Sequence, residues 1–102
     1  KTFKITIGNE RNIEKVIQDE NIHYIHMAFG KDEALPEHFS HSTVYMTVVR
    51  GILSVSLDEQ EIHKYQAGTV LKIPFQTKMN VRNKEADVLE LIVVKAPAPI
   101  NI

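Results

Sequence analysis

Short apolar segments separated by turn residues recur along almost the whole chain. They fall at 22–29, 43–49, 52–57, 62–67, 69–73, 79–83 and 88–94. The links between them are too short for the helical crossovers that parallel strands need. Regularly spaced short strands of this kind are typical of antiparallel sandwiches and barrels. We therefore predict one all-β domain over residues 1–102, with a core barrel at about 22–95 and an extended, proline-containing tail at 96–102.

The first twenty residues carry two different patterns. Apolar and polar residues alternate over residues 3–7, which predicts a first strand. In residues 10–20, ERNIEKVIQDE, the apolar side chains of Ile13, Val16 and Ile17 follow the spacing of a helix. The segment is short, so we predict one short helical turn near the N-terminus.

The composition narrows the classes of function. The net charge is −1 and acidic and basic residues are interleaved, so no basic stripe favours nucleic acid or an anionic membrane. The chain has no cysteine, which leaves His, Asp and Glu as the strong metal ligands. No stretch reaches the roughly 20 apolar residues of a membrane span. The opening KTFKITIGNE lacks the apolar core of a signal peptide, and we predict a cytoplasmic protein.

Four residues stand at a characteristic spacing in the second half of the chain. Gly51 follows an apolar segment, five residues separate Gly68 from Pro74, and Asn83 comes nine positions after that proline. This pattern resembles the conserved-barrel cupins, which are small antiparallel jelly-roll β-barrels, also called double-stranded β-helices. The resemblance covers roughly residues 28–95.

The resemblance also locates the four metal ligands of the family, which are three histidines and one glutamate. The first histidine position holds His38, the second holds Ser40, and the glutamate position holds Val44. Met79 stands at the third histidine position, and Gln76 stands where the second motif has its second glycine. The resemblance therefore implies a cupin whose metal site is reduced to a remnant.

Six side chains are candidates for a pocket inside the barrel. They are His38, Ser40, Val44, Met46, Gln76 and Met79. The four from the first motif all stand at even positions, so in a strand their side chains point to the same side. The resemblance implies that this side faces the barrel interior. Methionine sulfur is a poor ligand for Mn, Fe(II) or Zn, whereas methionine fills irregular apolar gaps well. We therefore expect either a packed core or a small apolar pocket with a few polar groups.

A rearranged metal site is a second hypothesis. His41 has the opposite parity to His38, and we expect it on the rim in water, although a turn could bring both histidines to one metal. On the preceding strand we expect His26 to face the barrel, and Glu37 could support a histidine. Such a site would hold Mn, Fe, Ni or Zn, and the resemblance implies isomerase or dioxygenase chemistry for it.

The outer face of the barrel suggests a third hypothesis. Tyr45 shares parity with Thr43 and Thr47, which predicts an outward row that could pack against another subunit. The resemblance implies a homodimer. Our leading prediction is a cupin that binds a small apolar or amphipathic molecule, or is otherwise non-catalytic, without a cofactor. A metal-dependent enzyme and a structural or regulatory dimer subunit are the alternatives.

Overall fold

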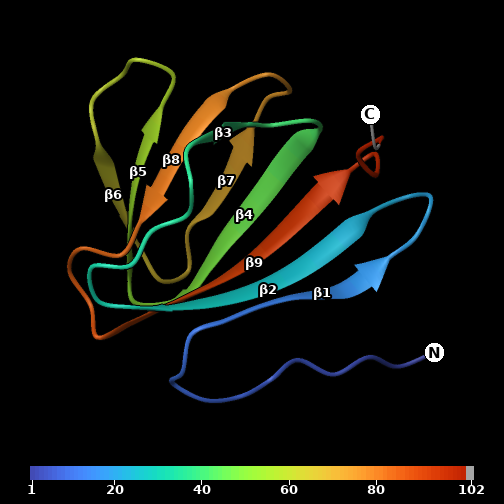
Figure 1. Cartoon of the computed structure of the whole chain (residues 1–102), viewed down its shortest axis with the longest axis horizontal. Helices are drawn as coiled ribbons and strands as arrows, with labels where there is room; N and C mark the ends of the chain where they lie inside the picture. The colour runs from blue at the N-terminus through green and yellow to red at the C-terminus, as the bar shows by residue number, and fades with distance from the viewer. Residues whose placement is uncertain (101–102) are drawn as a thin grey trace.

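Two antiparallel β-sheets face each other in the computed structural model, which describes residues 1–100 (Figure 1). The strands are β1 (Asn12–Gln18), β2 (His23–Gly30), β3 (His38–Phe39), β4 (Thr43–Arg50), β5 (Ile52–Leu57), β6 (His63–Gln66), β7 (Val70–Ile73), β8 (Lys78–Arg82) and β9 (Val88–Ala96). One sheet has the order β1-β2-β9-β4-β7, and the other has the order β3-β8-β5-β6. Among the described residues there is no helix, and hence none that could span a membrane.

The core lies between the sheets because alternate residues of a strand point to the same side. In β4, Val44, Met46 and Val48 are at most 2% exposed, whereas Tyr45 and Val49 lie on the outer face. Each fully buried aliphatic side chain contributes roughly 1.5–3 kcal/mol relative to an exposed one. The core cluster consists of Ile25, Met27, Phe29, Val44, Met46, Val48, Leu53, Val55, Leu71, Ile73, Met79, Val81, Leu89, Leu91 and Val93.

The all-β prediction is confirmed, but the predicted helical turn is wrong. The segment forms strand β1, which pairs antiparallel with β2. The register shifts between Lys15 and Ile17, which marks a β-bulge at Val16. The extra residue of the bulge breaks the alternation and produces an apolar spacing that resembles a helix. Isoleucine and valine favour strands, and the backbone bonds to β2 outweigh the helical pattern.

Residues 1–11 extend beside β1 without joining either sheet, so the strand predicted at 3–7 is wrong (Figure 1). The alternating apolar side chains do not form a buried face, since Phe3 is 52% exposed and Ile7 is 91% exposed. One anchor of the segment is the Thr6 backbone N–H, which donates to the Glu14 carboxylate at 2.8 Å. The hydrogen bonds from Thr6 lower the pKa of Glu14 because they stabilise its charged form.

Asn83 joins two chain connections at one end of the barrel. Its side chain is fully buried, and Nδ2 donates to the Phe29 carbonyl at 3.1 Å while Oδ1 accepts the Ala86 N–H at 3.2 Å. Its backbone bonds to Asp32 and Glu33 at 2.7 and 2.9 Å. All of its polar groups are thus used to hold the β2–β3 connection against the β8–β9 connection.

Two glycines of the cupin-like pattern have backbone angles that favour glycine. Gly51 has a φ of 90° and Gly68 has a φ of 94°. Side chains rarely adopt such angles because Cβ meets the following carbonyl. Their surroundings differ, however. A Cβ at Gly51 would fall inside van der Waals contact with the Val88 carbonyl oxygen, whereas a Cβ at Gly68 would meet no atom within 4 Å.

Replacing each glycine by alanine should separate strain from steric overlap. We expect Gly68→Ala to lower the free energy of unfolding by about 1–2 kcal/mol, the usual cost of a side chain at positive φ. Gly51→Ala should cost more than about 3 kcal/mol because backbone of the paired β9 must also move. Urea denaturation of both variants measures the difference. Equal losses would contradict the close approach of Gly51 to β9.

Candidate functional site

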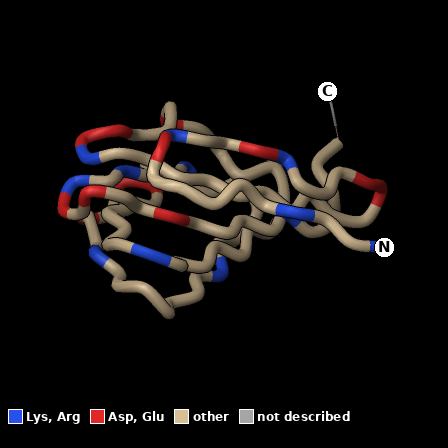
Figure 2. Tube along the Cα trace, turned by 90° about the horizontal axis from the view of Figure 1, so that it is seen from below, with Lys and Arg blue, Asp and Glu red and all other residues tan. Residues whose placement is uncertain are grey.

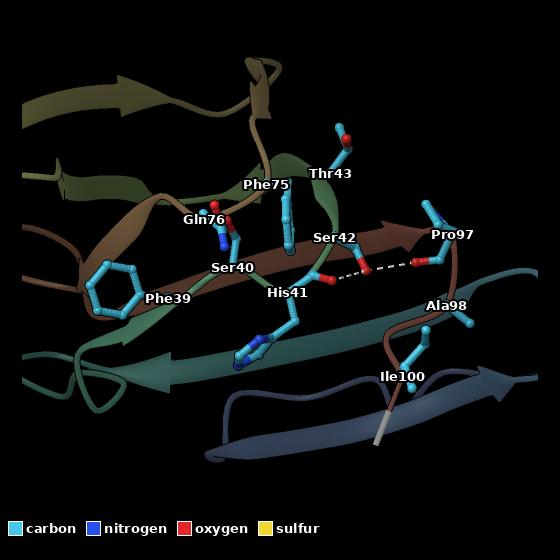
Figure 3. A pocket seen from close by; sticks show the side chains of 10 residues that line it. All are labelled: Phe39, Ser40, His41, Ser42, Thr43, Phe75, Gln76, Pro97, Ala98 and Ile100. Carbon is cyan, nitrogen blue, oxygen red and sulfur yellow. Dashed lines mark hydrogen bonds between the residues drawn. The ribbon is translucent and has the colours of Figure 1, made fainter. Parts of the chain in front are cut away.

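A cavity of about 940 Å³ lies where the chain crosses from β3 to β4, at the end of the barrel near the last residues of β9 (Figure 3). Three segments line it: β3 with its link to β4, the turn between β7 and β8, and the tail that follows β9. Figure 3 shows the tail on one side of the space and the other two segments across from it. The lining residues are Phe39, Ser40, His41, Ser42, Thr43, Phe75, Gln76, Pro97, Ala98 and Ile100.

Ser40 joins two of these segments. Its Oγ donates to the Pro74 carbonyl at 2.6 Å and accepts the Thr77 N–H at 2.9 Å. The Ser40 N–H donates to the Thr77 carbonyl, and the Gln76 N–H donates to the Ser40 carbonyl, both at 2.9 Å. Ser40 is 2% exposed, so these bonds form away from water. They fix the β3–β4 link against the β7–β8 turn and make one wall of the cavity rigid.

Ser42 holds the tail in a similar way. Its Oγ donates to the Pro97 carbonyl at 2.6 Å, and the side chain is 4% exposed (Figure 3). The Ala98 N–H donates to the Asn21 carbonyl at 2.9 Å, so the tail also contacts the β1–β2 hairpin. Of the tail predicted at 96–102, Ala96 belongs to β9, and residues 97–100 form no strand and line the cavity as far as Ile100. The last two residues of that prediction lie outside the described residues.

The β7–β8 turn places an aromatic ring and an amide at the cavity. Gln76 has a φ of 63°, a left-handed angle that glycine adopts most easily. Gln76 occupies the position where the cupin motif has glycine, so the backbone keeps the shape of the motif although the residue has changed. Phe75 precedes it and is 57% exposed. The turn therefore presents Phe75 and Gln76 to the cavity instead of a bare backbone.

Among residues 1–100 no carboxylate, lysine or arginine lines the cavity, and His41 is the one titratable side chain in the lining. Figure 2 shows acidic and basic residues distributed along the whole trace. The lining is mostly apolar, and the hydroxyls of Ser40 and Ser42 are already used to hold the walls. The side chains left for a ligand are therefore apolar surfaces, together with the groups of His41, Thr43 and Gln76.

Five of the six predicted pocket residues separate into two groups, and His38 belongs to neither. Ser40 and Gln76 line the cavity, whereas Val44, Met46 and Met79 belong to the packed core. Sequence reasoning missed the greater part of the lining, including both aromatic rings and the tail. Phenylalanines next to a motif proline and a motif histidine could have drawn attention, because apolar side chains that gather in one exposed patch mark binding sites more often than single ones do.

The chain resembles a protein of Methanocaldococcus jannaschii over most of its length. It is 36% identical over 87 residues to the uncharacterized protein MJ0764, which is 85% of this chain and 75% of that protein. The crystal structure of MJ0764, an RmlC-like cupin family protein with a double-stranded β-helix fold, matches 97% of this chain and 92% of its own, at 32% identity and a TM-score of 0.94. The chain belongs to the RmlC-like cupin family. No model of a known protein family matches it.

Two further solved structures are similar at lower identity. TT1209 from Thermus thermophilus is 25% identical, with a TM-score of 0.76, and the match covers 88% of this chain and 86% of that one. Bacillus subtilis oxalate decarboxylase, which has Mn(II) centres, is 14% identical with a TM-score of 0.70, over 80% of this chain and 22% of that one. At this identity the second likeness concerns the cupin fold alone.

The side chains at the cupin ligand positions do not fit a metal. Val44 and Met79 are 1% and 3% exposed in the apolar core, and Ser40 Oγ bonds to the backbone. His38 is half-buried, and its Nδ1 lies 2.8 Å from the Pro36 carbonyl, which leaves Nε2 as its free nitrogen. One histidine with two apolar neighbours offers no coordination sphere. Among residues 1–100 no group of three or more His, Asp or Glu could hold a metal.

His26 does not face the barrel interior, and that expectation is wrong. It is 1% exposed, but its ring lies on the opposite side of β2 from Ile25 and Met27. Its Nε2 lies 2.6 Å from the Glu90 carboxylate, and its Nδ1 lies 3.8 Å from the Glu14 carboxylate. His26 therefore connects β1, β2 and β9 on the outer face, where it cannot join His38 and His41.

A further histidine, His63, and the candidates Glu37 and Tyr45 lie on the surface. His63 is exposed on β6, beside the ring of Tyr65. Glu37 is exposed, with one carboxylate oxygen 3.9 Å from Lys78 Nζ. Tyr45 faces outward from β4, as its parity predicts. None of these side chains lines the cavity.

Metal analysis tests the interpretation of the ligand positions. After purification without chelators and incubation with Mn, Fe(II), Ni or Zn, we expect far less than one bound ion per chain, because the donor set is incomplete. Mass spectrometry of the untagged protein, beside His38→Ala, measures this. One ion per chain that disappears in His38→Ala would show that the cupin metal site persists in another form.

Proposed function

We propose that this cupin binds a small apolar or amphipathic molecule in the cavity at the barrel end, without a catalytic metal. The observation that carries the proposal is the cavity of about 940 Å³ with mostly apolar walls. Cavities of roughly 300–1,000 Å³ with a few polar groups are typical of small-molecule sites. The packed core supports this location, because Val44, Met46 and Met79 leave the family's usual interior site filled.

The lining suggests how a ligand would be held. Phe39 and Phe75 are 53% and 57% exposed, and Ile100 is 83% exposed, so a ligand could cover apolar surface that now contacts water. Burying such surface contributes roughly 25 cal/mol per Å². The amide of Gln76 and the imidazole of His41 can orient a polar group of the ligand. Ser40 and Ser42 keep the walls in place, which reduces the entropy lost on binding.

A metal-dependent isomerase or dioxygenase is the alternative, and it is less well supported. It uses His38 and His41 at one metal, with His26 or Glu37 as a further ligand. His26 is bonded to Glu90 on the outer face instead, and His41 lines the cavity while His38 does not. The arrangement of these side chains therefore favours binding over metal chemistry.

Removing one aromatic wall should weaken binding. The neutral fluorescent probe N-phenyl-1-naphthylamine should bind the wild-type protein saturably, and Phe75→Ala should raise its Kd about tenfold, since about 1.4 kcal/mol of apolar contact is lost. Ile62→Ala is the matched control, because Ile62 is 50% exposed and lies away from the cavity. Both residues are exposed, so the melting temperature should hardly change. Failure of the probe to bind, or equal Kd values for the two variants, would contradict the proposal.

We also propose that the protein forms homodimers through the outer face of β4 and β7. Tyr45, Val49 and Val70 are 37%, 45% and 61% exposed on neighbouring strands of this face. Lys72 Nζ lies 5.8 Å from the centre of the Tyr45 ring. Aromatic and aliphatic side chains gathered on one face support a contact with a second copy.

A charge at the centre of this face should disrupt the dimer. We expect the wild-type protein to be dimeric at micromolar concentration and Tyr45→Asp to shift it toward monomer, because the carboxylate would be desolvated in the contact. Sedimentation velocity over a concentration series measures the change, with Ile62→Asp as the control on another part of the surface. A monomeric wild type, or a dimer unaffected by Tyr45→Asp, would exclude this contact.

A further inference from the structure

Backbone hydrogen bonds bring two phenyl rings, those of Phe39 and Phe75, to the same cavity. The Gln76 N–H donates to the Ser40 carbonyl, and the Ser40 N–H donates to the Thr77 carbonyl, both at 2.9 Å. These bonds set the β3–β4 link beside the β7–β8 turn. The residue before Ser40 and the residue before Gln76 are the two phenylalanines, and both line the cavity. Figure 3 shows their rings apart, with the Gln76 side chain between them in this view.

Both rings leave more than half of their surface open. Phe39 is 53% exposed and Phe75 is 57% exposed. The face of a phenyl ring carries partial negative charge and its edge partial positive charge, so a second ring packs against it in an offset or edge-to-face arrangement. A saturated ligand can cover the same apolar area, but it has no ring to make this contact. Two open rings at one cavity therefore favour an aromatic ligand over an aliphatic one.

The amide of Gln76 is the polar group nearest to the two rings along the chain, since it follows Phe75 directly. Its backbone position is fixed by the bond to Ser40 and by the left-handed φ of 63°. The amide has an oxygen that accepts hydrogen bonds and a nitrogen that donates them. It can therefore bind either a hydroxyl or a carbonyl group on a ligand whose ring contacts Phe75.

The lining favours an uncharged ligand. Within the described part of the chain it consists of apolar side chains, hydroxyls, one amide and one imidazole, with no lysine, arginine or carboxylate. A charged group that leaves water needs an opposite charge or several hydrogen bonds to offset the loss of its hydration. A hydroxyl or carbonyl loses less hydration, and one bond to an amide is enough to replace it.

We infer that the cavity takes uncharged aromatic molecules that carry a hydroxyl or carbonyl group, such as phenols. The aromatic part contacts Phe39 and Phe75, and the polar group bonds to the Gln76 amide. This inference rests on the proposed binding function and adds the class of ligand. A saturated alcohol of the same skeleton would lack the ring contacts, and an aromatic acid would bring its charge to walls without a cation of fixed charge.

Three compounds with one carbon skeleton test the inference: 4-phenylphenol, 4-cyclohexylcyclohexanol and biphenyl-4-carboxylate. Their affinities are measured at neutral pH by displacement of N-phenyl-1-naphthylamine from the intact protein. We expect 4-phenylphenol to bind the wild type about tenfold more tightly than its saturated counterpart, because ring–ring contacts add about 1.4 kcal/mol. Biphenyl-4-carboxylate should also bind more weakly than 4-phenylphenol, because its charge loses hydration.

Replacing each ring by leucine assigns the preference to its residues. Leucine keeps an apolar surface but removes the ring, so Phe39→Leu and Phe75→Leu should each reduce the preference for 4-phenylphenol over the saturated alcohol to about threefold. The double variant should abolish it, while the Kd of the saturated alcohol should hardly change. Phe3→Leu is the matched control, because Phe3 is 52% exposed and lies outside the lining, and it should keep the full preference.

The outcomes separate this inference from the proposed function. If the probe binds but 4-phenylphenol and 4-cyclohexylcyclohexanol compete equally in the wild type, the aromatic preference is wrong and the apolar site stands. A preference that survives in the double variant overturns the assignment to Phe39 and Phe75. Equal competition by biphenyl-4-carboxylate and 4-phenylphenol overturns the restriction to uncharged ligands. If the probe does not bind the wild type, the proposed binding function itself fails.

Discussion

Apolar packing between the two sheets is the constraint on which the rest of the structure depends. In a metal cupin the barrel interior must hold polar ligands, but here Val44 and Met79 occupy two of those positions and are almost fully buried. Their contacts with Met46 and the facing strands stabilise the barrel as an ordinary core does. Because the interior is filled, the space for a small molecule lies at the barrel end, where the chain crosses between the sheets.

The barrel end is shaped by hydroxyl groups on two small residues. Ser40 stands at a family ligand position, but its Oγ now links the β3–β4 connection to the β7–β8 turn. Ser42 connects the same segment to the tail. A position that serves metal binding in the family has thus become structural, since a buried hydroxyl needs hydrogen-bond partners and the nearby backbone supplies them. The cavity walls are a consequence of these bonds.

Charge placement differs between the two faces of the larger sheet. On the outer face His26 lies between Glu14 and Glu90, with Nε2 bonded to the Glu90 carboxylate and Nδ1 3.8 Å from that of Glu14. On the inner face Lys95 has no such partner among the described residues. The same sheet therefore has a buried histidine beside two carboxylates on one face and a half-buried lysine on the other.

The sequence alone determined the fold and which residues stand at the metal-ligand positions of the family. Period-two patterning and short links predict an antiparallel barrel, and the spacing of Gly51, Gly68, Pro74 and Asn83 reflects turns and buried bonds that have few other solutions. Only the tertiary structure decided the rest. The bulge at Val16 makes a strand look helical, because one extra residue shifts the period locally. The cavity is lined by segments that lie about sixty residues apart in the sequence. The pairing of polar groups depends on the register between strands, which the linear pattern does not contain.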